Sequence, residues 1–349
     1  MKQKRATIKN VAEESGVSIA TASRVLSNTD YPVSAELRSR VEEAARKLSF
    51  AYTVAPRQAR NQDMGEIALI IPNISNPFYM QTIQGISSVC YEKKYQLVLC
   101  NSQWDFARET YFLQDLYNRK INGVIISSIS DSPASLSAYA ERGMSIVQLD
   151  QRFDGDAGLN INYDSRLGAQ LAVRHLIEKG HKKIAFASTP LTRWTRKEIY
   201  KGYNEQLKKA GIEPDEELVF INNSKHPEDS DNHEVFVGET LAMEILESGC
   251  GATAVFCVND MVAFGMISGF EKLGKRVPDD ISVVGFDDIP FSSVFMPALT
   301  TIHCPAYETG RLSAIMLIDR LESGTSVATP LNMHLQPSLV ERSSVRSII

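Results

Sequence analysis

Hydrophobic residues follow one pattern in the first fifty positions and another after residue 65. In the first part, apolar positions recur every three or four residues, which predicts three short helices. The helices start after Thr7, Ser18 and Ser34, which are residue types that cap helix N-termini. Ser15-Gly16-Val17 separates the first two helices. Two short helices joined by a tight glycine turn are typical of a helix-turn-helix.

After residue 65, continuous apolar runs alternate with helical segments such as 165–179 and 197–210. The runs are EIALIIP, YQLVLCN, GVIISS, SIVQLD, KKIAFAS, LVFIN, TAVFCVN and SVVGFD. They do not alternate between apolar and polar residues, so they predict strands buried on both faces, as in parallel sheets covered by helices. The number of these runs exceeds the number of strands that one small lobe contains. We therefore expect an α/β body with two lobes, each a doubly wound parallel sheet.

Charge is distributed unevenly along the 349 residues. Residues 1–60 contain 11 Lys and Arg against 6 Asp and Glu, whereas the remainder contains 26 against 36. A small basic region on an acidic body indicates that only the first region meets a polyanion. The five cysteines lack metal-ligand spacing and predict reduced core residues. No stretch has the roughly 18 apolar residues of a membrane span, and we expect a cytoplasmic protein.

The second helix, SIATASRVLSN, is the candidate for reading DNA. Its buried face holds Ala22, Val25 and Leu26, and its opposite face shows Ser18, Ile19, Ala20, Ser23 and Arg24. Arginine can bind guanine through two hydrogen bonds, and short apolar side chains can touch a thymine methyl group. Hydroxyl groups and the helix N-terminus suit phosphates. The alternative is a capped helical hairpin with no role in DNA binding.

Several stretches carry a resemblance to a known family. ATIKNVAEESGVSIATASRVLSN resembles the N-terminal signature of the LacI/GalR family of bacterial repressors. IPNISNPFY, LIEKGHKKIAF, AVFCVNDMVAFG, VPDDISVVGFDD, ALTTIHCP and LVERSS follow in the order that this family has. The resemblance implies a homodimer on a pseudo-palindromic operator, with a sugar-like effector between two lobes shaped like periplasmic binding proteins.

The same resemblance implies the domain organisation. Residues 1–50 form the helix-turn-helix domain, 51–65 the hinge or linker, and 66–349 the domain for effector binding and dimerisation. The chain crosses between the lobes three times in this fold, so each lobe is discontinuous. We expect lobe one at about 66–162 and 291–322, and lobe two at about 163–290 and 323–343.

By position in the family, the residues of the head divide into two groups. Ile19, Ala20 and Arg24 fall where the family reads bases, and Thr7, Ser18, Thr21, Ser23 and Ser27 fall where it meets phosphates. Ile19 and Ala20 offer no side-chain hydrogen bonds, which leaves Arg24 as the main polar reader. Ala22 stands where valine is usual; because it faces the core, we expect looser packing and unchanged specificity.

The hinge, YTVAPRQARNQ, departs from the family pattern. The resemblance puts Ala59 where a leucine usually enters the minor groove, with Arg60 next to it. Pro56 falls in the first helical turn, where proline is tolerated. A methyl group cannot fill an unstacked base step, so we expect a smaller bend, or a hinge that reads a narrow minor groove through Arg57 and Arg60. The alternative is a linker whose arginines only release counterions.

Candidate effector contacts follow the predicted strands, because ligands in α/β folds sit at the carboxyl ends of strands. These residues are Asn76, Phe78, Trp104, Asp105, Ser128, Asp150, Asn259 and Asp287. Amides, carboxylates and aromatic rings together suit a polyol. The resemblance supports Phe78, Asp150, Asn259 and Asp287. The alternatives are helix N-caps for the aspartates and ordinary lobe packing for Phe78.

The stretch LTRWTRKEIYKGY brings cations to the same edge. Arg193, Trp194 and Arg196 follow a predicted strand and precede a helix, whose N-terminus favours an anion. Ile199 stands where the family commonly has arginine. We therefore expect an acidic sugar, such as a uronate or a keto-deoxy sugar acid, held by Arg193 or Arg196. The alternative is a solvated helix flank.

The sequence thus favours a ligand-controlled repressor of carbohydrate genes. Within this class, control by a partner protein in place of a small molecule stays open. A sugar-binding protein without a DNA role and an enzyme acting on a carbohydrate are the other classes. We expect neither a cofactor nor a metal, and we interpret the polar segment 222–234, which contains His233 and Glu234, as a solvated loop.

Overall fold

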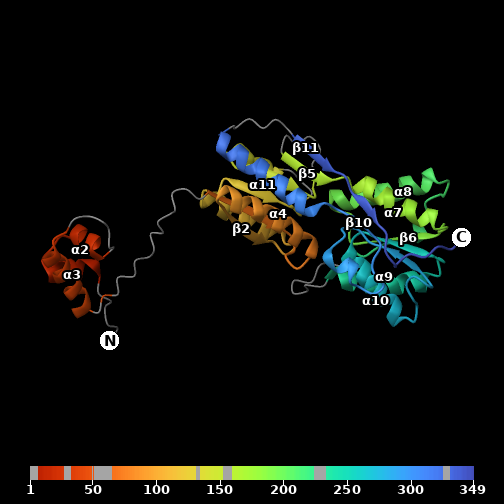
Figure 1. Ribbon diagram of the computed structural model, residues 1–349, viewed down its shortest axis with the longest axis horizontal. Coiled ribbons are helices and arrows are strands. Elements are labelled where there is room, and N and C mark those ends of the chain that lie inside the picture. Colours follow the sequence, from red (N-terminus) through yellow and green to blue (C-terminus); the bar gives the residue numbers. More distant parts are fainter. Residues whose placement is uncertain are drawn as a thin grey trace. The chain divides into compact units, whose positions relative to one another are not determined.

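The computed structural model describes residues 7–26, 33–48, 50, 65–130, 134–151, 159–223, 233–324 and 331–349. The chain divides into two compact units, Met1–Met64 and Gly65–Ile349, which we call the head and the body (Figure 1). Among the described residues, no helix has the length and apolar character that a membrane crossing needs.

The head contains the three predicted helices, α1 (Ile8–Ser15), α2 (Ile19–Leu26) and α3 (Ala35–Lys47). Gly16 turns the chain between α1 and α2 with a φ of 66°, a left-handed conformation that glycine adopts without strain. The side chain of Ser18 starts α2 by accepting a hydrogen bond from the Thr21 backbone at 3.1 Å. Ala22 is fully buried beside Val11, which agrees with the prediction that it faces the core.

The first sheet of the body is parallel, with the strand order β11-β5-β4-β3-β1-β2. Its strands are β1 (Gly65–Ile71), β2 (Tyr95–Asn101), β3 (Gly123–Ile126), β4 (Ser145–Leu149), β5 (Leu159–Tyr163) and β11 (Leu331–Leu335). In β1, Ile67 and Leu69 join one hydrophobic cluster, while Ala68 and Ile70 join another. The strand is therefore buried on both faces, which explains its unbroken apolar run.

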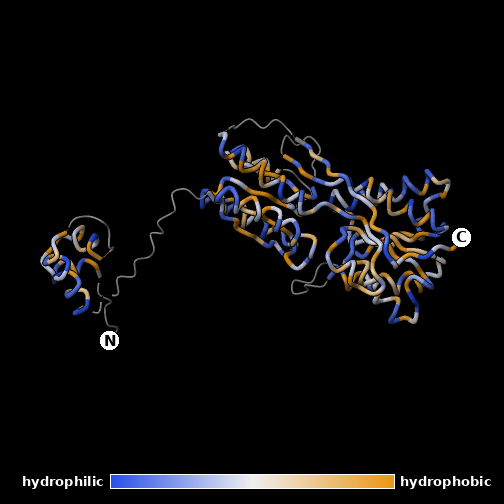
Figure 2. The backbone as a smooth tube through the Cα atoms, in the orientation of Figure 1, coloured by the Kyte–Doolittle hydropathy of each residue, from blue (hydrophilic) through white to orange (hydrophobic). Residues whose placement is uncertain are grey.

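The second sheet of the body is also parallel, with the order β7-β6-β8-β9. Its strands are β6 (Ile184–Ser188), β7 (Val219–Ile221), β8 (Ala254–Cys257) and β9 (Ser282–Val284). The hydropathy colouring of the body shows apolar segments along the strands and mixed segments along the helices (Figure 2). Both sheets thus have the doubly wound character that the apolar runs predict.

Helices cover the sheets (Figure 1). They are α4 (Pro77–Lys93), α5 (Phe106–Asn118), α6 (Ala134–Glu141), α7 (Ser165–Glu178), α8 (Trp194–Lys209), α9 (His233–Ser248), α10 (Asp260–Lys272), α11 (Ala306–Ser323), and the short 3₁₀ helices η1 (Glu216–Leu218) and η2 (Pro290–Ser293). α4 and α11 lie side by side, and a Cβ on Gly85 would stand 2.1 Å from the Tyr307 carbonyl oxygen. The close contact of these helices therefore needs glycine at position 85.

The pairing of β11 corrects part of the predicted lobe ranges. We expected 323–343 in the second lobe, but β11 (Leu331–Leu335) pairs in parallel with β5, from Leu331↔Leu159 to Leu335↔Tyr163. Its backbone donors and acceptors find their partners in the first sheet, so this segment belongs there. Beyond it, β12 (Ser338–Val340) pairs antiparallel with β10 (Thr301–His303). The other lobe boundaries stay predictions.

Asp260, the first residue of α10, joins this helix to η2 and to the segments on either side of η2. Its fully buried carboxylate accepts hydrogen bonds from the Ile289 backbone at 3.0 Å, from the Ser292 hydroxyl at 2.6 Å and from the Thr301 hydroxyl. Burial raises the pKa of Asp260 from 3.8 to about 6, and the three hydrogen bonds only partly oppose this. The folded state therefore binds a proton at this carboxyl more tightly than the unfolded chain does.

This pKa predicts a pH-dependent difference in stability between the wild type and Asp260→Asn. Between pH of about 4 and 6 the folded state holds more protons, so rising pH lowers the free energy of unfolding of the wild type. Relative to the variant, we expect a decrease of about 3 kcal/mol across this window and a constant difference above it. Urea unfolding of both proteins at several pH values measures the difference in their free energies of unfolding. A difference that stays constant from pH 4 to 7 would contradict the prediction.

Candidate functional site

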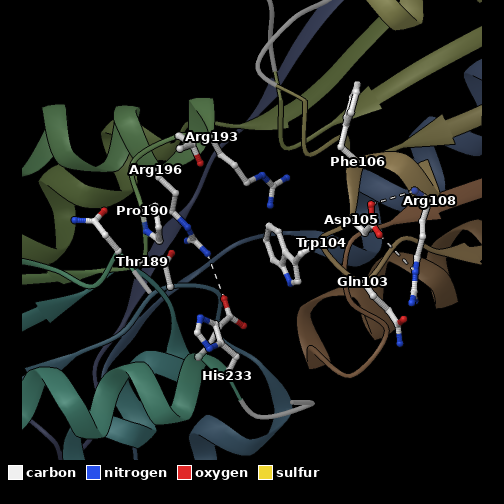
Figure 3. A pocket seen from close by; sticks show the side chains of 13 residues that line it. Gln103, Trp104, Asp105, Phe106, Arg108, Thr189, Pro190, Arg193, Arg196 and His233 are labelled. Atoms are coloured by element: carbon white, nitrogen blue, oxygen red, sulfur yellow. Dashed lines mark hydrogen bonds and ion pairs between the residues drawn. The ribbon is translucent and has the colours of Figure 1, made fainter. Parts of the chain in front are cut away.

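Two adjoining cavities lie where the strands of both sheets end, and Figure 3 shows the larger one, the outer cavity. The outer cavity has a volume of about 520 Å³ and is lined by Gln103, Trp104, Asp105, Phe106, Arg108, Thr189, Pro190, Thr192, Arg193, Arg196, Asn223, His233 and Glu234. The inner chamber, of about 20 Å³, is lined by Asn76, Phe78, Tyr79, Trp104, Asp150, Tyr163, Arg193, Thr195, Arg196, Glu234 and Asp287. Trp104, Arg193, Arg196 and Glu234 belong to both, so they form the boundary between the two spaces.

The backbone is strained at several of these lining residues. Gln103, Trp104, Asp150 and Asp287 have φ values of 52°, 59°, 53° and 127°. Non-glycine residues rarely take positive φ, and such conformations gather at functional sites, where the surrounding fold holds them. The strain brings Trp104 and the two aspartates to the cleft from three different strand ends. This backbone geometry supports the cleft as the candidate functional site of the body.

Arg193 is the central cation of the cleft. It occupies the N-cap position of α8, and its side chain is buried, with 7% of the residue exposed. The guanidinium donates to the Ser127 hydroxyl at 2.9 Å and to the Tyr79 hydroxyl at 3.4 Å, and it lies 5.5 Å from the centre of the Trp104 ring. Among the described residues, its Nε has no hydrogen-bond partner and no carboxylate forms an ion pair with it. Asp150 accepts a hydrogen bond from the same Ser127 hydroxyl at 3.3 Å, so Ser127 lies between this acid and Arg193.

Arg196, in contrast, has a carboxylate partner. Its Nη2 lies 3.5 Å from Glu234 Oε1, and its Nη1 donates to the Val258 carbonyl at 3.0 Å. Glu234 also accepts from Asn76 at 2.8 Å and from Asn259 at 2.6 Å. Arg196 is therefore paired with a carboxylate within the protein, whereas Arg193 forms no ion pair with any carboxylate among the described residues.

Glu234 and His233 correct the interpretation of 222–234 as a solvated loop. Both residues are buried because α9 begins at His233 and turns its first residues into the cleft. Residues 224–232 lie outside the described part of the chain. The sequence contained no signal for this placement, since the partners of Glu234 come from α4, α8 and α10, all distant in the chain.

Two buried aspartates complete the polar lining. Burial raises the pKa of Asp150, although Arg193 and Ser127 oppose the shift, and burial together with the nearby Asp260 raises the pKa of Asp287. In the described residues neither aspartate caps a helix; Asn76, Asp105 and Asn259 do, at the starts of α4, α5 and α10. The alternative that the aspartates are helix N-caps therefore holds for Asp105 and not for Asp150 and Asp287. The inner pair offers carboxyl oxygens for hydrogen bonds with ligand hydroxyl groups.

The structure gathers eight of the predicted effector residues at the two cavities: Asn76, Phe78, Trp104, Asp105, Asp150, Arg193, Arg196 and Asp287. Three lie elsewhere. Ser128 donates to the buried Glu109 at 2.6 Å, Asn259 is fully buried beneath Glu234, and the Trp194 ring lies 6.4 Å from the His334 ring. Residues at the cavities that the sequence did not single out as effector contacts include Tyr79, Tyr163, Thr195 and Glu234.

In the head, the predicted reading face of α2 is open to solvent. Ser18, Ile19, Ala20 and Arg24 are exposed, and Ile19 has 51% of its surface accessible, which is unusual for a large apolar side chain. Thr7 precedes α1, and Thr21 and Ser23 are partly buried. The predictions for Ser27, Pro56, Arg57, Ala59 and Arg60 concern residues outside the described part of the chain.

Comparisons with known proteins cover almost the whole chain. The family model for bacterial regulatory proteins of the lacI family matches residues 7–52, and the model for the periplasmic binding protein-like domain matches 173–345. The HTH-type transcriptional repressor PurR of Photorhabdus laumondii is 34% identical over 343 residues, covering 97% of each chain. PurR of Vibrio atlanticus is 31% identical over 345 residues, covering 98% of this chain and 99% of the relative.

Solved structures show the same likeness. The transcriptional regulator CelR in complex with cellobiose has a TM-score of 0.71 and 26% identity, covering 97% of this chain and 100% of that one. A LacI family regulator from Enterococcus faecium with bound ribose has a TM-score of 0.71 and 26% identity, covering 81% and 100%. The lac repressor dimer bound to operator and the anti-inducer ONPF has a TM-score of 0.69 and 26% identity, covering 98% and 100%.

These relatives are regulators and not enzymes, which agrees with the predicted regulator and contradicts the alternative of an enzyme acting on a carbohydrate. The match to the helix-turn-helix model also excludes a sugar-binding protein without a DNA role. Operator binding and binding of a small molecule are properties that the chain's relatives support. The chain belongs to the LacI family of bacterial DNA-binding transcriptional repressors.

Proposed function

We propose that this repressor is a homodimer that binds a pseudo-palindromic operator and responds to a sugar acid in the cleft of the body. Arg193 is the observation that carries the proposal. It is a buried cation at a helix N-terminus, without a carboxylate partner among the described residues and with an Nε still able to donate. A ligand carboxylate supplies both the charge and the acceptor that this position lacks.

The rest of the cleft fits the carbohydrate part of such a ligand. Trp104 offers an aromatic surface for the apolar face of a sugar ring in the outer cavity, and Asp150 and Asp287 offer acceptors for a hydroxyl group that reaches the inner chamber. Two structurally similar regulators carry cellobiose and ribose by their descriptions. These observations favour a carbohydrate acid over an acid without hydroxyl groups.

A homodimer is supported by exposed apolar side chains on the body. Phe291, Val294 and Met296 lie within six residues and are 53%, 71% and 85% exposed. An apolar patch of this kind is typical of a protein interface. The lac repressor structure, which is similar in fold, is described as a dimer on its operator.

A second candidate effector is a purine. Relatives at 31% and 34% identity are named PurR, which points to purine metabolism. A planar base could stack on Trp104, and a carbonyl group of the base could accept a hydrogen bond from Arg193. Control by a partner protein is the outcome that remains if no small molecule binds.

The test measures ligand and operator binding together. Galacturonate, glucuronate and a keto-deoxy sugar acid are compared with the neutral parent sugars and with purine bases by calorimetry, and operator affinity is measured with and without each ligand. We expect a sugar acid to bind and to change operator affinity by roughly 5- to 150-fold, while its neutral parent does neither. Binding of purines or neutral sugars in preference to acids would overturn the sugar-acid effector.

A further inference from the structure

We infer that the effector has two rings, with the second ring packed against Phe106 at the rim of the outer cavity. The inference rests on the proposed function, because it concerns the same cleft. Beyond the proposed function, it specifies the size of the ligand and the residue that favours a ligand of this size. Three observations carry it, namely the unequal volumes of the two spaces, the strained segment that forms one wall, and the exposed aromatic ring at its end.

The volumes decide where the ligand lies. The inner chamber measures about 20 Å³, which is room for one water-sized group and not for a ring. Only a substituent of the ligand reaches Asp150 and Asp287 in this structure. The outer cavity measures about 520 Å³, within the range of roughly 300–1,000 Å³ that is typical of pockets for drug-sized ligands. The body of the ligand therefore occupies the outer cavity, which has more room than a single ring needs.

One wall of the outer cavity is a short strained segment between β2 and α5. Gln103 and Trp104 both have positive φ, and the Trp104 backbone N–H is held by the Pro72 carbonyl at 3.1 Å. Asp105 then caps α5 by accepting from the Ala107 backbone at 2.7 Å. Two consecutive strained residues are costly to maintain. The result of this conformation is that Trp104 and Phe106 line the same cavity from adjacent positions.

The two aromatic residues have different surroundings, which separates the two ring positions. Trp104 lies against Arg193, beside the inner chamber, and is partly buried. Phe106 is 50% exposed, lines only the outer cavity and points away from Trp104 and Arg193 (Figure 3). A ring that touches Arg193 and Trp104 thus leaves Phe106 uncovered. A second ring linked to the first buries the Phe106 side chain and removes its apolar surface from water.

Calorimetry with the full chain tests the inference through pairs of ligands that differ by one ring. The pairs are galacturonic acid with digalacturonic acid, glucose with cellobiose, and adenine with adenosine, in which the fused purine base counts as a single ring system. For the pair that binds, we expect the two-ring member to bind about tenfold more tightly. Phe106→Ala lowers the affinity of the two-ring member by about two- to tenfold and leaves that of the one-ring member unchanged.

Tyr111→Ala is the matched control, because Tyr111 lies on α5, is 66% exposed and lines neither space. It should leave both affinities unchanged. Equal affinities within a pair, or an equal effect of Phe106→Ala on both members, would overturn the two-ring effector whatever the charge of the ligand. If the neutral or the purine pair binds in place of the acids, and its larger member still binds more tightly, only the proposal of a sugar acid is overturned. Failure of every pair to bind overturns both.

Discussion

Arg193→Ala is expected to weaken effector binding by at least about 30-fold and to remove the effect of the ligand on operator affinity. Loss of one partner of a buried, charged hydrogen-bonded pair costs about 2–5 kcal/mol, which corresponds to roughly 30- to 5,000-fold. Arg193 meets this condition because it is buried at the boundary of both spaces. Calorimetry with the sugar acid that binds the wild type measures the loss.

Two further variants control this experiment. Arg193→Lys keeps the charge but loses the planar fork, so an intermediate loss is expected. Arg119→Ala removes an exposed arginine that lies after α5, 3.5 Å from Asp115 and away from both cavities, and should leave ligand affinity unchanged. Operator binding without ligand should be the same in all variants. Tight binding of the sugar acid to Arg193→Ala would show that the carboxylate lies elsewhere.

The hydrophobic pattern predicted the strands that are buried on both faces, and it missed others for a physical reason. Each of the eight apolar runs contains a strand of one of the two parallel sheets. β5 has the sequence LNINY, in which Asn160 and Asn162 interrupt the apolar pattern although both are buried. β10, β11 and β12 contain polar residues as well, and β10 and β12 have only three residues each. Their pairing depends on contacts between distant segments, which no local pattern records.

The candidate site shows the same limit. Positions after strands indicated the cleft, because strand ends meet at one edge of a parallel sheet. The choice between Arg193 and Arg196 stayed open, since it depends on Glu234, which lies near them only in the folded chain. The start of α8 mattered too: it begins at Trp194 and not at 197, which makes Arg193 the residue at the helix N-terminus.

Arg24→Ala is expected to lower specific operator affinity by roughly 5- to 150-fold for each half-site. The side chain is exposed on α2, at the position where the family resemblance puts base contacts. A two-bond contact between arginine and guanine contributes about 1–3 kcal/mol of discrimination. Ile19 and Ala20 have no polar side-chain atoms, so they cannot replace it. Titrations with the operator and with unrelated DNA, at one fixed salt concentration, measure the loss.

Arg46→Ala separates base reading from simple charge. Arg46 is an exposed arginine in the last turn of α3, so both variants remove one positive charge from the head. Loss of a phosphate contact or of general charge lowers affinity for all sequences alike. We therefore expect Arg46→Ala to lower the affinities for the operator and for unrelated DNA by the same factor. Arg24→Ala should lower the affinity for the operator far more than the affinity for unrelated DNA. If Arg24→Ala lowers both affinities by the same factor, this side chain contacts the phosphate backbone. Base recognition would then depend on the apolar contacts of Ile19 and Ala20.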